Sequence, residues 1–317
     1  EVNTNHLLMM GVSDLRKDNV NLERLTLQNL SQGDVNTLIS DTMQSTPADS
    51  RPLSQLVFAK TAGNAFFTHQ MLHSLNEEHL LVFDASSRYW EWDMPALLSM
   101  DITDNVVELM VSKLKRLPVA SQEALKLAAC IGNQFDLATL AIIAQKSEAI
   151  TFRNLQAVVR EGILSVLNDL YRFTHDRIQQ AAYSLIPDAD KAELHLEIAQ
   201  LLQQQIPEQE QDKRLFEIVD HLNASAAMVT DPTERESIVA LNLRAGLKAR
   251  VSAAYEATLI YFKSGLALLA DDCWHSQYDL ALALTENAAE VASFEGQFEE
   301  SQRFIKNVIN NAKSILD

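Results

Sequence analysis

The 317-residue sequence is poor in residues that form turns and cross-links: it has 8 glycines, 7 prolines and 2 cysteines. So few glycines and prolines, beside abundant alanine, leucine and glutamine, favour a mainly helical protein. Two isolated cysteines, Cys130 and Cys273, exclude a disulfide framework and suit a reducing compartment. No apolar run approaches the roughly 18 to 20 residues of a membrane span. No signal peptide is predicted, so we expect a cytoplasmic protein without membrane contact.

Positive charge is also scarce. The chain has 26 Lys and Arg against 43 Asp and Glu, a formal net charge of −17 at pH 7. Residues 1–118 carry a net charge of −6, residues 119–186 are neutral, and residues 187–317 carry −11. No basic face is visible, which argues against nucleic acid as the main partner.

The motifs of common enzymes are missing as well. The sequence has no glycine-rich loop that ends in Lys-Ser/Thr, no dinucleotide-binding fingerprint and no Gly-x-Ser-x-Gly elbow. His69 and His73 are four residues apart on a predicted helix, a spacing compatible with metal ligation, but no third ligand accompanies them. The sequence therefore predicts no catalytic constellation and no metal site.

The first 118 residues mix helical and strand patterns. We expect a short strand over Leu25–Leu27 and then a helix that carries Val35, Leu38 and Ile39. A helix is predicted from about 53 to 75, interrupted near 61–63. A change of period over 80–93 predicts a β-hairpin, with Trp90 and Trp92 on one face covering a core edge. An amphipathic helix over 104–116 ends at Leu117-Pro118.

Residues 119–173 give the clearest local pattern. It predicts a helix that stops at Gly132, a second helix capped by Asp136, and a third that stops at Gly162. Two short strands over 163–167 and 170–173 follow, joined by an Asn168-Asp169 turn. Three helices followed by a hairpin is the order of a winged helix.

Everything after Asp176 is predicted to be helical. Segments 253–257 (AAYEA) and 296–300 (GQFEE) stand 43 residues apart, and each opens a helix that follows another helix. Their small–x–aromatic–acidic pattern resembles tetratricopeptide-type hairpins of irregular length. The predicted helices lie near 177–185, 189–205, 213–228, 232–249, 253–270, 276–294 and 297–316.

The segment Arg172–Arg177 lies where the second wing strand meets the next helix. One interpretation is structural: Asp176 caps the helix and His175 satisfies a nearby carbonyl. The other is functional: His175, held by Phe173 and Asp176, faces a phosphate.

Several of these patterns occur in the order known from one protein family. They are Gly63-Asn64-Ala65-Phe66-Phe67, the Tyr89–Trp92 hairpin, the Leu117-Pro118 step, Ala128-Ala129-x-x-Gly132-x-x-Phe135, and the run Phe173–Tyr183 (FTHDRIQQAAY). Together they resemble the signal-transduction ATPases with numerous domains (STAND), a branch of the AAA+ ATPases. The nearest subgroup is the ATPase module of large bacterial sensors, which a serine/threonine kinase-like domain precedes and GAF and histidine-kinase domains follow.

The resemblance covers essentially the whole chain and implies a domain plan. Residues 1–50 are expected to be the C-terminal end of an ATPase core. Residues 51–118 are expected to form a helical lid with a β-hairpin, residues 119–186 a winged helix, and residues 187–317 a tetratricopeptide-like array.

The resemblance also implies half of an ADP or ATP site. Gly63 and Asn64 are expected beside the adenine, although Ala65 stands where the family usually has a proline. His175 is expected to touch the β-phosphate and hold a closed, inactive state. The phosphate-binding Lys and magnesium-binding Asp are expected upstream of Glu1, so this chain alone should bind nucleotide weakly and hydrolyse little or no ATP.

The favoured hypothesis is thus a regulatory fragment of a bacterial signalling ATPase, whose partners are the upstream ATPase core, linked kinase domains and a protein bound to the helical repeats. One alternative is a helical-repeat adaptor without a nucleotide role. The other is a DNA-binding winged helix with residues 151–162 as the recognition helix, for which only Arg153 and Arg160 are available.

Overall fold

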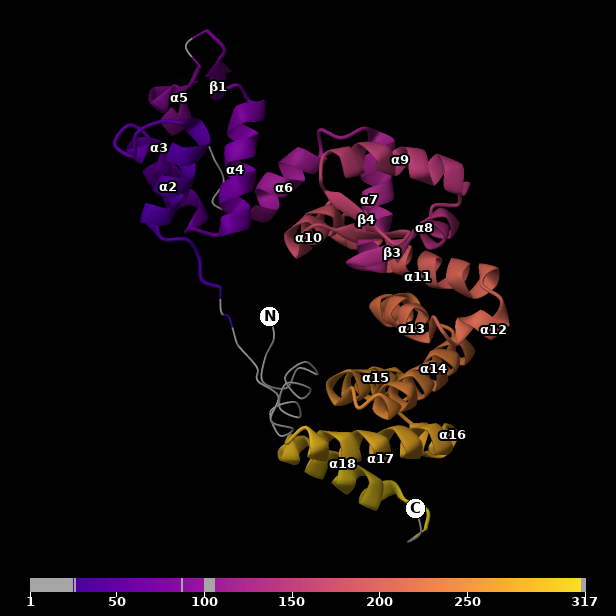
Figure 1. The fold of residues 1–317 in the computed structure, drawn as a ribbon. Helices are drawn as coiled ribbons and strands as arrows, with labels where there is room; N and C mark the ends of the chain where they lie inside the picture. Colours follow the sequence, from indigo (N-terminus) through magenta and orange to yellow (C-terminus); the bar gives the residue numbers. More distant parts are fainter. Residues whose placement is uncertain (1–24, 26, 87, 100–105, 315–317) are drawn as a thin grey trace. The chain divides into compact units, whose positions relative to one another are not determined.

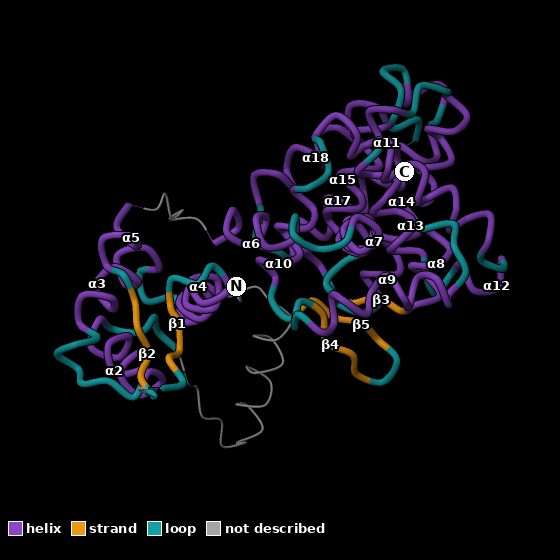
Figure 2. Tube along the Cα trace, turned by 90° about the horizontal axis from the view of Figure 1, so that it is seen from above, coloured by secondary structure: helices purple, strands orange, loops and turns teal. Residues whose placement is uncertain are grey.

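The computed structural model describes residues 25, 27–86, 88–99 and 106–314 of the chain. The described residues form two compact units. The first ends at Ile186 and the second begins at Pro187. Both are mainly helical, and two small antiparallel sheets lie in the first (Figures 1 and 2). The mainly helical fold class expected from the scarcity of glycine and proline is confirmed.

The first unit begins with a helical subdomain and a β-hairpin. Ser31 and Asp34 form a capping box at the start of α2 (Gln32–Met43). The predicted interruption near residue 62 is present, because Ala62 and Gly63 both adopt positive φ. The elements are α2 (Gln32–Met43), α3 (Arg51–Thr61), α4 (Ala65–Glu77), β1 (Leu81–Asp84), β2 (Tyr89–Trp92) and α5 (Met94–Ser99).

These elements form one hydrophobic cluster. Its members come from both sides of position 50, the boundary expected between the ATPase core and the lid. In the hairpin register Leu81 pairs with Trp92 and Phe83 with Trp90. Both tryptophans are half-buried against the cluster, as the alternating pattern predicts. Its buried members are Val35, Ile39, Met43, Leu53, Val57, Met71, Leu75, Leu81 and Leu97.

The rest of the first unit has the element order of a winged helix. The sheet order is β3-β5-β4, all antiparallel. Asn168 and Asp169 have φ values of 51° and 63°, and positive φ at both central residues suits the tight turn of a hairpin. The elements are α6 (Val106–Leu114), α7 (Val119–Ile131), β3 (Gln134–Asp136), α8 (Leu137–Ile143), α9 (Glu148–Arg160), β4 (Leu164–Leu167), β5 (Leu170–Phe173) and α10 (Asp176–Ser184).

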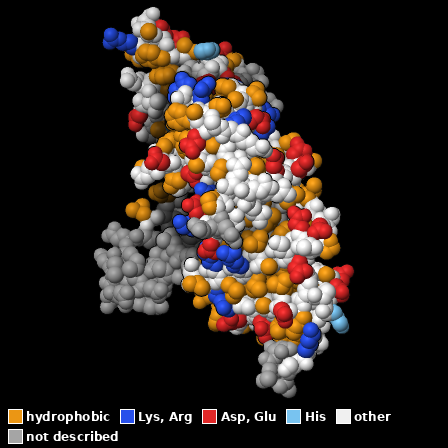
Figure 3. Space-filling view, turned by 90° about the vertical axis from the view of Figure 1, so that its right-hand side faces the viewer, with side chains coloured by type: hydrophobic (Ala, Val, Ile, Leu, Met, Phe, Trp, Pro, Cys, Tyr) orange, Lys and Arg blue, Asp and Glu red, His pale blue; other side chains and the backbone are white. Residues whose placement is uncertain are grey.

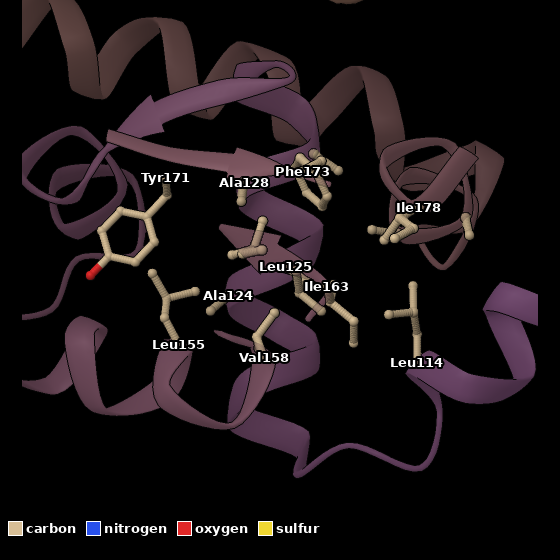
Figure 4. Close-up of a cluster of buried hydrophobic side chains, with 14 of the residues drawn as sticks. Leu114, Ala124, Leu125, Ala128, Leu155, Val158, Ile163, Tyr171, Phe173 and Ile178 are labelled. Atoms are coloured by element: carbon tan, nitrogen blue, oxygen red, sulfur yellow. The ribbon is translucent and has the colours of Figure 1, made fainter. Parts of the chain in front are cut away.

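One core joins these helices to the sheet. In Figure 4, Leu125 lies at the centre of the cluster, and Leu114 of α6 faces Ile178 of α10. Phe173 of β5 is 1% exposed in the same cluster. Helix α6 therefore packs in the same core as α7, α10 and the sheet although it precedes the Leu117-Pro118 step.

The second unit is an array of helices in which each long helix packs on the next (Figure 1). The helices predicted after Asp176 are present with shifted bounds, but the one expected over 213–228 is divided in two at Ser225. Positions 315 and 316 of the last predicted helix lie outside the described residues. The elements are α11 (Asp188–Gln205), α12 (Glu208–Gln211), α13 (Leu215–Ala224), η1 (Ala226–Met228), α14 (Pro232–Val251), α15 (Tyr255–Leu268), α16 (Cys273–Ser276), α17 (Tyr278–Phe294) and α18 (Phe298–Asn311).

Two hairpins of this array, α14–α15 and α17–α18, repeat each other with the predicted offset. Ala253 and Gly296 occupy the same place in their turns, with φ values of 53° and 73°. The residue after each donates its N–H back to the preceding helix, from Ala254 to Ala249 over 3.1 Å and from Gln297 to Ala292 over 2.8 Å. The sequence repeat is therefore a structural repeat.

Some expectations differ from the structure. Leu25 and Leu27 belong to no strand and are 85% and 88% exposed, while Thr26 lies outside the described residues. Residues 1–24, nearly half of the expected end of an ATPase core, also lie outside them. The sequence patterns did not predict α5, β3, α12 or α16, each six residues or shorter.

Candidate functional site

The His175 junction, defined by Asn64, Phe66, His175, Asp176 and Arg177, gathers the residues singled out by the sequence. His175 is the N-cap of α10, with an extended backbone. Its Nδ1 accepts a hydrogen bond from the Arg177 N–H over 3.1 Å and lies 2.5 Å from Asp176 Oδ1. Because Nδ1 faces the helix end, Nε2 is the ring nitrogen left for a ligand.

This geometry corrects two details of the sequence interpretation. The capping residue is His175, and Asp176 is the first residue of the helix; the Asp176 carboxylate still accepts the Arg177 N–H over 2.8 Å. The aromatic partner of His175 is Phe66 of α4: their rings stack with centroids 4.0 Å apart and planes 14° apart. Phe173, the expected partner, is buried in the core.

Gly63 and Asn64 form the turn between α3 and α4. Asn64 is the N-cap of α4, and its Oδ1 accepts the Phe67 N–H over 2.9 Å. Gly63 O accepts the Leu30 N–H over 2.8 Å. The turn therefore holds the segment before α2 against the end of α3, and Ala65 simply begins α4.

The structure connects this turn to His175 through one residue, Phe66, two positions after Asn64. The His175 side chain is 34% exposed and that of Asp176 is 77% exposed. Arg177 donates to Gln180 Oε1 over 2.9 Å. The junction can thus offer one imidazole nitrogen and a nearby guanidinium to an anion, with a carboxylate beside them that opposes it.

No group of three or more His, Cys, Asp or Glu residues with metal-ligand geometry occurs in the described ranges. His73 Nδ1 lies 3.0 Å from Glu77 Oε1, and the His69 and His73 ring centroids are 6.4 Å apart.

Sequence reasoning missed a buried histidine pair in the second unit: His195 and His221 place their Nδ1 atoms 2.7 Å apart. The two histidines are 26 residues apart on different helices, so no local sequence pattern relates them.

On the face that Figure 3 shows, Lys and Arg side chains lie scattered among acidic and hydrophobic ones rather than in one continuous patch. Within the described part of the chain, no helix has both the length and the apolarity to cross a membrane.

Comparison with known proteins gives two signalling relatives. The chain is 29% identical over 381 residues to "Hybrid signal transduction histidine kinase G" of Dictyostelium discoideum, covering 98% of this chain and 11% of that protein. It is 23% identical over 258 residues to "Peroxide stress-activated histidine kinase mak3" of Schizosaccharomyces pombe, covering 79% of this chain and again 11% of the relative. The chain thus spans about a ninth of each relative, and no family model matches it.

Among solved structures, a STAND protein with a tetratricopeptide repeat sensor from Pyrococcus horikoshii matches at 13% identity and a TM-score of 0.39, over 92% of this chain and 42% of the other. Both curated relatives are eukaryotic. They give no support to the bacterial setting expected from the sequence.

Proposed function

We propose that this chain is a regulatory part of a signal-transduction ATPase, and that its nucleotide state controls partner binding and the output of linked kinase domains. The two relatives are both named as histidine kinases, which supports a signalling role. The observation that supports nucleotide binding is the placement of His175. Its Nδ1 accepts a hydrogen bond from its own helix, and its ring stacks on Phe66, so that Nε2 is the nitrogen proposed to contact a phosphate.

The proposed ligand is ADP or ATP, held jointly with an ATPase core of the full-length protein. The residues present fit a single phosphate contact, from His175 Nε2. Gly63 O and Asn64 Oδ1 each accept a backbone N–H group, and the side-chain NH2 group of Asn64 is the donor that these two residues are proposed to offer a base. This chain alone is therefore proposed to bind nucleotide weakly.

The helical array is proposed to bind a protein partner through α18. Phe298, Ile305 and Ile309 of this helix are 65%, 46% and 71% exposed. Phe262, which the 43-residue repeat places in the position of Ile305, is fully buried between helices of the array. Exposed apolar residues that gather on one helix can mark a protein interaction surface.

The test is calorimetry of ADP binding to the full-length protein, with three variants. His175→Ala removes the ring and the helix cap together. His175→Asn keeps a side-chain oxygen that can cap α10 but removes Nε2. Ser147→Ala removes the cap of α9, where Ser147 Oγ accepts the Ile150 N–H, and controls for the loss of any cap in the same subdomain.

We expect both His175 variants to weaken ADP binding by tenfold or more, about 1.4 kcal/mol, and Ser147→Ala to leave it unchanged. If His175→Asn binds ADP like the wild type, and His175→Ala merely melts earlier, the phosphate contact is refuted.

That second outcome supports the alternative function, a helical-repeat adaptor without a nucleotide role. One observation favours it: His175, Gly63 and Asn64 each have a structural task in their own turn or helix. The adaptor interpretation expects nucleotide to change nothing, even in the full-length protein.

A further inference from the structure

A slot lies between helix α9 and the β4–β5 hairpin of the winged helix. Its volume is about 430 Å³, and its walls come from Phe152, Leu155, Gln156, Val159 and Arg160 on the helix and from Val166 and Tyr171 on the hairpin. Pockets for small molecules commonly measure about 300–1,000 Å³ and are largely apolar, with a few polar groups that fix orientation.

The two walls follow from the local geometry. The helical residues are spaced so that they share one face of α9. Val166 and Tyr171 are directly opposite each other in the hairpin register, so their side chains share one face of the sheet. In Figure 4 the Tyr171 ring lies beside Leu155, and its hydroxyl points away from the buried cluster.

The slot is polar at one end. Phe152 lies near the start of α9 and Arg160 is its last residue, about 12 Å further along the axis at 1.5 Å per residue. Gln156 precedes Arg160 by one turn. The Arg160 Nε lies 3.4 Å from Gln156 O, and no carboxylate pairs with this guanidinium within the residues that the structure describes.

We propose that this slot binds a small amphipathic carboxylic acid, with its apolar chain along α9 and its carboxylate at Arg160. Charge complementarity selects an acid: a guanidinium without an internal carboxylate partner stands at the edge of an apolar slot. The C-terminal end of a helix repels anions, so Arg160 is the group on which recognition depends.

The phenol of Tyr171 also lines the slot. It is uncharged at neutral pH, as in any tyrosine, and can donate a hydrogen bond; burial and the nearby Asp169 raise its pKa further. The site uses none of the His175 junction residues, so it stands or fails independently of the nucleotide proposal.

The experiment titrates the 317-residue chain with octanoate, butanoate and octylammonium by calorimetry. Octanoate is about the length of the slot, butanoate is too short to reach Phe152, and octylammonium has the same chain with the opposite charge. Arg160→Gln removes the proposed partner of the carboxylate. Arg153→Gln is the matched control, an exposed arginine on α9 that does not line the slot.

We expect octanoate to bind at least fivefold more tightly than butanoate and octylammonium. Arg160→Gln should weaken octanoate binding by fivefold or more, while Arg153→Gln leaves it unchanged. Absence of octanoate binding overturns the proposal. So does equal binding of octylammonium, or indifference to Arg160→Gln, since either result identifies the slot as a non-selective apolar surface.

Discussion

Gly63 makes the turn between α3 and α4 possible. Its φ is +71°, and a Cβ atom there would lie 1.9 Å from the backbone oxygen of Leu30. Gly162 also has a left-handed backbone, with φ +66°, but nothing within 4 Å of a Cβ. We expect Gly162→Ala to lower the free energy of unfolding by about 1–2 kcal/mol through backbone strain alone. Gly63→Ala should cost at least about 2 kcal/mol more, as measured by urea unfolding.

The pair of variants separates strain from contact. A Gly63→Ala loss no larger than that of Gly162→Ala contradicts the close approach of Leu30 to the turn. The expected excess, in contrast, shows that the glycine of the Gly63-Asn64 motif is needed for packing whether or not a nucleotide is bound.

The buried histidines of the second unit make its stability depend on pH. His195 and His221 are 8% and 3% exposed, and their Nδ1 atoms are 2.7 Å apart, which suits one donor and one acceptor on two neutral rings. Burial, and then the proximity of His195, lower the pKa of His221 to about 4. Burial also lowers the pKa of His195.

A histidine whose pKa is lower in the folded state binds fewer protons there than in the unfolded chain. The neutral pair therefore contributes its full share of the unfolding free energy above the ordinary pKa of 6.5. That contribution is lost as the pH falls toward 4, because the unfolded chain takes up the proton first. Between pH 6.5 and 4 the wild type should lose on the order of 3 kcal/mol of unfolding free energy through His221. We expect His221→Gln to remove most of this loss. The exposed His275→Gln is the control in urea unfolding; identical profiles for wild type and His221→Gln contradict the buried pair.

At the scale of elements, the α14–α15 hairpin depends on a small residue at the helix crossing. A Cβ on Gly246 would lie 2.3 Å from the Phe262 ring. Gly to Ala in an open helix stabilises by up to about 1 kcal/mol, as we expect for Gly33→Ala, where a Cβ meets only Ser31 Oγ at 3.6 Å. Gly246→Ala should instead destabilise by about 1–3 kcal/mol through overpacking.

A second substitution tests the cause. Phe262→Leu in the Gly246→Ala background makes room at the crossing, so the double variant should lose less stability than the sum of the single changes. Thermal unfolding of the four proteins gives the coupling. Strict additivity would place the defect of Gly246→Ala elsewhere than at the Phe262 ring.

The elements that the sequence predicted are those with enough residues to display a period. The predicted helices after Asp176 repeat their apolar positions over two or more turns, and the Tyr89–Trp92 strand alternates beside a turn. The three-residue β3 and the four-residue α12 and α16 display no period. Leu25 and Leu27 alternate like a strand, yet their side chains are exposed and no sheet includes them.

The candidate site was only partly predictable for a related reason. Sequence reasoning identified His175 at a helix start, but the choice between His175 and Asp176 as N-cap depends on the backbone where β5 ends. The stack of His175 on Phe66 joins two residues 109 positions apart, and a contact of that range has no local pattern. The Arg160 slot was missed because its wall residues Val166 and Tyr171 come from a hairpin whose register only folding reveals.

At the scale of the whole molecule, charge decides whether a segment with the element order of a winged helix binds DNA. The chain carries −17 in all, and residues 187–317 alone have 11 basic and 22 acidic residues. Residues 119–186 are neutral. Affinity for DNA comes largely from release of counterions by clustered Lys and Arg, and the face of α9 offers an apolar slot with Arg160 at one end.

We therefore expect no shift of duplex DNA by this chain in a gel at low salt, where non-specific binding is strongest. A matched comparison uses residues 106–186, which keep α6 with the core it packs in and omit the acidic array. Their 9 basic and 7 acidic residues give too small an excess of positive charge for DNA binding, so this segment too should leave the DNA unshifted. A shift by either protein that Arg153→Gln and Arg160→Gln together abolish would establish α9 as a DNA-reading helix and place the winged helix in a different functional class.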